Sequence, residues 1–92
     1  MEENFKRLAA CILQKEEDQV TDEEKKRAML AYGRLADPTI KFIIDYRVGL
    51  RFEPKTIEET SFLMVMDLDK TKQLLNKGLK ILKNYYQNPT AD

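Results

Sequence analysis

Residue types that carry chemistry are scarce in this sequence of 92 residues. Histidine is absent, which removes the most common general acid–base side chain. The single cysteine, Cys11, excludes an internal disulfide, and one cysteine without histidine excludes a zinc site within one chain. No phosphate-cradling glycine loop or nucleophile motif is present. We therefore predict no enzyme activity, no catalytic residue, no metal site and no cofactor.

Long apolar segments are also missing. The longest apolar stretch, Phe62 to Met66, is far too short to cross a bilayer, and no signal peptide is recognisable. These features and the single cysteine favour a cytoplasmic protein without a membrane partner.

Helix-forming residues and charge make up much of what remains. Hydrophobic residues account for 42% and charged residues for 35%, which is typical of a folded globular chain. The formal net charge is zero. From Asp69 to Tyr86, however, five lysines accompany one acid, so one segment is strongly basic.

Apolar spacing and capping signals predict an all-α fold of about five helices in a single domain, residues 1–92. Residues 1–34 are expected to form the N-terminal helices, and residues 35–88 are expected to form the remaining helices of the same domain. Threonine–glutamate capping boxes and Asp–Pro mark helix starts, and glycine marks a stop. The predicted helices are Phe5 to Leu13, Asp22 to about Leu35, a helix capped by Asp37 that ends at Gly49, a helix capped by Thr56 that ends near Val65, and a long helix capped by Asp67 that ends near Gln87.

The last two helices form a short helix, a brief turn and a long basic helix. This order is typical of a helix-turn-helix, although other helical hairpins share it. Four blocks stand out between Leu35 and Lys83: 35–50 (LADPTIKFIIDYRVGL), 56–59 (TIEE), 69–73 (DKTKQ) and 77–83 (KGLKILK). In order and composition these blocks resemble region four of bacterial sigma factors.

The resemblance implies that the final helix enters the major groove of duplex promoter DNA. Phosphate contacts would position the helix and contacts to base edges would specify sequence. The DNA-binding residues that it implies are Lys72 and Gln73 at bases or phosphates, Asp69 at a base edge, Lys70 and Lys77 beside them, and Arg47 and Thr56 at phosphates.

The resemblance implies a second partner, because region four also docks on the β flap of the RNA polymerase core through its earlier helices. The apolar helix containing Ile40, Ile43 and Ile44 is the candidate surface for this contact. The alternative is that at least half of these side chains belong to the core.

Three departures from the family pattern bear on function. Leu68 replaces an arginine, so direct base readout is weakened or altered. Val65 replaces a turn glycine, so we expect either a different turn or a longer fourth helix. The apolar run Phe62 to Met66 includes positions that are usually charged in the family.

One helix cannot bury five consecutive residues against one core. The run is therefore either covered by the N-terminal helix or a surface for a partner that includes Phe62, Leu63 and Met66. A homodimer through this run is also left open.

Two functions follow as expectations. The first is a sigma-like transcription regulator that contacts promoter DNA, RNA polymerase or both. The alternative is a protein-interaction module that holds RNA polymerase or a partner sigma subunit without reading DNA.

Overall fold

The computed structural model describes residues 4–51 and 53–89 and is entirely helical in that part of the chain. The predicted all-α class and the number of main helices are confirmed. The elements are α1 (Phe5–Leu13), the 3₁₀ turn η2 (Glu17–Gln19), α2 (Asp22–Arg34), α3 (Pro38–Ile44), the π-helical turn η3 (Asp45–Gly49), α4 (Ile57–Leu63) and α5 (Leu68–Gln87).

Both predicted capping boxes form. The Thr21 hydroxyl accepts a hydrogen bond from the Glu24 amide at 3.1 Å, and the Glu24 carboxylate accepts one from the Thr21 amide at 2.9 Å. The same reciprocal pair joins Thr56 and Glu59, with the same two distances. Asp67 precedes α5 as predicted, but its side chain makes no capping hydrogen bond, so that part of the prediction is wrong.

The third helix begins and ends where predicted, but its last turn is π-helical and not α-helical. The Asp37 carboxylate accepts hydrogen bonds from the Thr39 and Ile40 amides, and the helix then continues through η3 to Gly49. Gly49 has a φ of 81°, and a Cβ there would lie 2.8 Å from the Pro54 ring. Glycine is therefore required where the chain leaves the helix.

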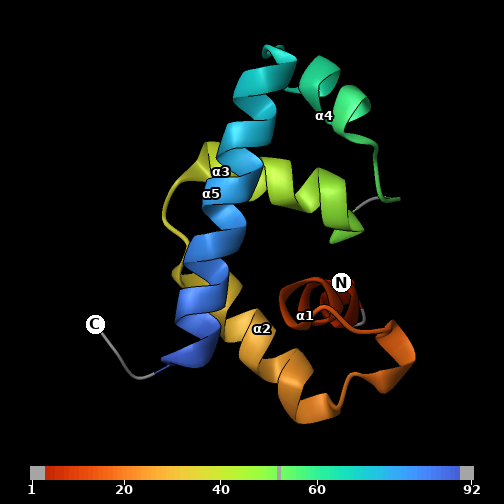
Figure 1. The fold of residues 1–92 in the computed structure, drawn as a ribbon, viewed down its shortest axis with the longest axis vertical. Helices are drawn as coiled ribbons and strands as arrows, with labels where there is room; N and C mark the ends of the chain where they lie inside the picture. The colour runs from red at the N-terminus through yellow and green to blue at the C-terminus, as the bar shows by residue number, and fades with distance from the viewer. Residues whose placement is uncertain (1–3, 52, 90–92) are drawn as a thin grey trace.

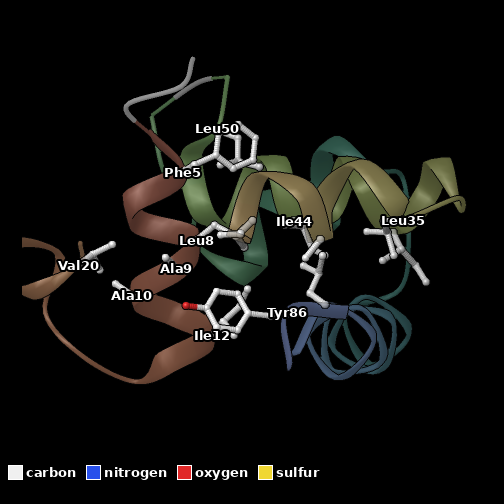
Figure 2. Close-up of a cluster of buried hydrophobic side chains, with 14 residues drawn as sticks. Phe5, Leu8, Ala9, Ala10, Ile12, Val20, Leu35, Ile44, Leu50 and Tyr86 are labelled. Atoms are coloured by element: carbon white, nitrogen blue, oxygen red, sulfur yellow. The ribbon is translucent and has the colours of Figure 1, made fainter. Parts of the chain in front are cut away.

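The long helix α5 organises the arrangement (Figure 1). Helices α2, α3 and α4 all pack against it, and α1 packs chiefly on α2. Figure 1 shows α4 beside the N-terminal end of α5, whereas α1 and α2 lie toward its C-terminal end. Figure 2 shows the buried side chains of α1 together with Ile44, Leu50 and Tyr86 in one hydrophobic cluster.

Two arginines of α2 hold the C-terminal end of α5. The Arg27 guanidinium donates to the Tyr86 carbonyl at 2.6 Å and lies 4.6 Å from the centre of that residue's ring. Arg34 lies 4.4 Å from the ring centre of Tyr85. Positive charge at a helix C-terminus is favourable, so these contacts fix which face of α5 turns inward. Among the described residues, no helix is long and apolar enough to span a membrane.

Candidate functional site

The exposed face of α5 is the most distinctive polar surface of the described chain. Helical periodicity separates two sides of α5, and Thr71, Gly78, Leu82 and Tyr86 are buried on the inner side. The outer side is polar along the whole helix. Its exposed residues are Asp69, Lys70, Lys72, Gln73, Asn76, Lys77, Lys80, Lys83, Asn84 and Gln87.

This face carries positive charge and many hydrogen-bond donors. Nine of its ten residues are lysine, asparagine or glutamine, and Asp69 is the single acid. Within residues 4–51 and 53–89, none of the five lysines makes an ion pair. Ammonium groups donate hydrogen bonds to anionic oxygens, and side-chain amides can both donate and accept hydrogen bonds.

Five of the residues predicted to bind DNA lie together on this face. Asp69, Lys70, Lys72, Gln73 and Lys77 are all exposed in the N-terminal half of α5. They share one side of the helix because the core of the molecule occupies the other side. The structure thus brings together the part of the predicted site that belongs to α5.

Arg47 lies elsewhere and is already engaged. Its Nη1 donates to the Lys55 carbonyl at 2.7 Å, and its half-buried guanidinium has an Nε with no hydrogen-bond partner. The contact ties the end of the third helix to the chain that leads into α4. Arg47 therefore fixes this connection and is not part of the exposed face of α5.

Thr56 is engaged as well, through its capping box with Glu59. The hydrogen bond from the Thr56 amide holds the pKa of the Glu59 carboxyl below its usual range. This carboxylate occupies the place that a phosphate would take at the start of α4, and the neighbouring Glu58 is exposed. The Thr56 amide and the Arg47 Nη1 group are thus engaged within the chain, whereas the exposed Thr56 hydroxyl accepts a hydrogen bond and keeps its own O–H donor.

The prediction that Ile40, Ile43 and Ile44 form a partner surface is wrong for this conformation. All three are fully buried, because α3 packs against α5 and lies close to its backbone at Gly78. A Cβ on Gly78 would lie 2.5 Å from Ile40 Cγ2. These side chains belong to the core, as the alternative interpretation held, and Phe42 is the exposed apolar residue of this helix.

Within the apolar run Phe62 to Met66, three side chains are exposed and the two methionines are half-buried. We call Phe62, Leu63, Val65 and Met66 the α4 patch. Phe62 is 82% exposed and Val65 is 93% exposed. The expectation that the N-terminal helix covers this run is therefore wrong, since α1 packs on α2 at the other end of α5 (Figure 1).

The α4 patch is exposed because α4 has only seven residues and Thr60 is the one that it buries. Two shallow hollows flank Phe62 and Leu63. Glu58 lines both hollows, with Lys55 and Glu59 on one side and Ser61, Val65 and Met66 on the other.

Val65 shows how the turn between α4 and α5 accommodates the absence of glycine. Its φ is 52°, in the left-handed region that glycine normally occupies. Neither expected outcome occurs, because the turn keeps its left-handed residue and α4 ends at Leu63. A hydrogen bond from the Ser61 hydroxyl to the Met66 carbonyl, at 2.5 Å, closes the turn.

One polar cluster has no counterpart in the sequence predictions. Asp45 is only 2% exposed; it accepts a hydrogen bond from the Tyr32 hydroxyl, and its second oxygen lies 3.5 Å from Arg51 Nε. Burial, together with the hydrogen bond to Asp45, raises the pKa of Tyr32. Because these residues come from α2, η3 and the following loop, no local pattern indicates their meeting.

No group of three or more potential metal ligands occurs among the described residues. Cys11 is exposed as a residue, but neighbouring groups partly shield its sulfur from solvent, and this partial desolvation raises the pKa of the thiol. No family model, curated protein or solved structure matches this chain. The exposed face of α5 and the α4 patch are therefore the two candidate functional surfaces of the described residues.

Proposed function

We propose that this chain is a sigma-like transcription regulator that contacts duplex promoter DNA through the exposed face of α5. The observation that carries the proposal is the composition of that face, where five lysines and four amide side chains accompany a single acid. Such a face supplies both phosphate and base-edge contacts. The regulator would act in the cytoplasm, together with RNA polymerase.

The connection between α4 and α5 supports this proposal. A seven-residue helix is followed by four residues and then a helix of 20 residues. The left-handed residue in the turn is what a tight helix-turn-helix needs. Half-buried Leu68 at the start of α5 supplies no base-pairing group, so binding would depend more on phosphates than on base identity.

The experiment compares two double variants. One combines Lys72→Ala and Gln73→Ala on α5, and its matched control combines Lys26→Ala and Gln19→Ala. Both pairs remove one exposed lysine and one exposed glutamine, but only the first pair lies on α5. Promoter-dependent transcription with purified polymerase is expected to fall for the α5 pair alone. Unchanged transcription for that pair would remove the basis of the proposal.

A second candidate function is favoured by the exposed α4 patch. An exposed phenylalanine and valine beside acidic side chains are typical of a protein-binding surface. In this alternative the chain holds the RNA polymerase core or a partner sigma subunit without reading DNA. The α4 patch would then be the partner-binding surface, because the α3 isoleucines predicted for that role are buried.

Phe62→Glu tests this alternative, with Leu30→Glu as the control. Both side chains are large, apolar and exposed, but Leu30 lies on α2. Immobilised protein is offered purified polymerase core with and without its sigma factor. Loss of binding for Phe62→Glu alone supports the alternative, whereas equal binding by both variants and the parent chain removes it. Association of the chain with itself is checked by sedimentation.

A further inference from the structure

The exposed face of α5 extends well beyond the residues that resemble a DNA-reading helix. Past Lys77 it continues through Lys80, Lys83, Asn84 and Gln87, all exposed and without an acid. From Lys70 to Lys83 the helix rises by about 20 Å, at roughly 1.5 Å per residue. That length exceeds the width of the major groove of B-DNA, which is about 12 Å.

The α4 side of the site is poor in phosphate donors. Arg47 donates to the Lys55 carbonyl, and the Glu59 carboxylate is held at the start of α4 by Thr56. Glu58 adds a second exposed carboxylate there. The exposed Glu58 and Glu59 outnumber the half-buried Lys55 beside them, so the start of α4 is less favourable to a phosphate than the five exposed lysines of α5.

We propose that duplex DNA lies along the whole exposed face of α5, and that Lys80 and Lys83 contact backbone phosphates in place of Arg47 and Thr56. This inference rests on the proposed DNA-binding function and deepens it. It names a binding surface that is displaced from the junction of α4 and α5 toward the C-terminal half of α5.

The proposed ligand is B-form DNA because of the shape of the face. It is one side of a single α-helix, and the major groove of B-DNA is about 12 Å wide and admits a helix. The major groove of A-form RNA is deep and narrow and excludes it. Lysines at both ends of the face would hold the two backbone edges, with Gln73 and Asn76 between them.

The test measures how binding of a fluorescent duplex of about two helical turns depends on salt, by anisotropy with the full chain. Each phosphate contact contributes about 0.9 to the slope of log affinity against log salt concentration. The double variant Lys80→Gln, Lys83→Gln is expected to reduce this slope by about 1.8. The double variant Lys70→Gln, Lys72→Gln is expected to reduce it by the same amount. Lys25→Gln with Lys26→Gln on α2 removes the same charge and is expected to leave the slope near that of the parent chain.

The possible results distinguish a failure of the extended binding surface from a failure of the proposed DNA-binding function. If the Lys70 and Lys72 pair lowers the slope and the Lys80 and Lys83 pair does not, the extended surface is wrong and DNA binding stands. If no duplex binds at low salt, both are wrong. An equal effect of the α2 pair would show that net charge alone governs binding and would overturn the assignment to α5. Equal affinity for an RNA duplex of the same length would overturn the assignment to the DNA groove. Circular dichroism confirms that each variant is folded.

Discussion

Val65 combines an unfavourable backbone conformation with a side chain that contributes almost no packing. A β-branched residue at a φ of 52° is strained, and the side chain is 93% exposed. The turn keeps this conformation because its neighbours enforce it, through the hydrogen bonds that Met66 makes with Ser61 on both its amide and its carbonyl. The strain is thus stored between the two helices of the proposed DNA-binding unit.

Val65→Gly is therefore expected to increase the free energy of unfolding by about 1 kcal/mol, because glycine adopts a positive φ without steric conflict. Val65→Ala is the control: it removes the same exposed branches but keeps a Cβ, and a much smaller change is expected. Urea denaturation followed by circular dichroism measures both. A gain for alanine equal to that for glycine would contradict the strain argument.

Half-buried Tyr32 donates a hydrogen bond from its hydroxyl to the buried Asp45 carboxylate. Burial and the hydrogen bond to Asp45 raise the pKa of Tyr32 above its usual value of about 10. The hydroxyl therefore ionises more readily in the unfolded chain than in the folded one. Its contribution to stability is complete below the unfolded pKa and is lost as the pH rises above it.

Tyr32→Phe is expected to weaken the alkaline loss of stability above about pH 10, compared with the parent chain. The loss should not disappear, because burial also raises the pKa of Tyr86. Unfolding by urea at a series of pH values measures this. If the variant lost stability with pH as steeply as the parent chain, ionisation of Tyr32 would not be its cause.

At the scale of elements, the crossing of α3 and α5 depends on Gly78. An added Cβ would lie 2.5 Å from Ile40 and 2.9 Å from Ile44. Both isoleucines are fully buried, so they have little room to move. Gly33, on α2, has no atom within 4 Å of an added Cβ and provides a natural comparison.

Gly78→Ala is expected to destabilise the protein by about 1–3 kcal/mol, because overpacking forces the two helices apart. Gly33→Ala should instead be neutral or stabilising by up to about 1 kcal/mol, since alanine favours helix. Thermal unfolding of both variants checks the pair. Equal effects in the same direction would show that the crossing is not tightly packed at Gly78.

The helices could be predicted from the sequence because their limits are set locally. Thr21, Thr56 and Asp37 accept hydrogen bonds from amides two or three residues ahead, so the chain segment itself contains the signal. The lysine side of α5 followed from periodicity in the same way. The site residues Asp69 to Lys77 therefore lie where the resemblance implied, although their role in DNA binding stays a prediction.

Long-range packing could not be predicted in the same way. Whether Ile40 to Ile44 faces a partner or the core is decided by where α5 crosses it, which the local pattern does not specify. The same holds for Phe62, which stays exposed because α1 packs on α2. The pairing of Tyr32 with Asp45 and the engagement of Arg47 with Lys55 also depend on the folded arrangement.

At the scale of the whole molecule, a formal net charge of zero conceals two regions of opposite sign. Acids are concentrated around η2 and the start of α2, and lysines on the outer side of α5. A neutral chain gains little from long-range attraction to DNA, so binding through α5 would be weak alone and stronger beside polymerase. We expect affinity for isolated duplex to fall steeply as salt increases.

We propose the exposed face of α5 as the DNA-binding surface. The most direct measurement is a titration of the ¹⁵N-labelled protein with duplex DNA at low salt, with backbone amide shifts followed by NMR. Our account predicts that the largest shifts fall on the outer side of α5, from Asp69 onward, while α2 stays unperturbed. Shifts confined to the α4 patch, or none at millimolar duplex, would contradict it.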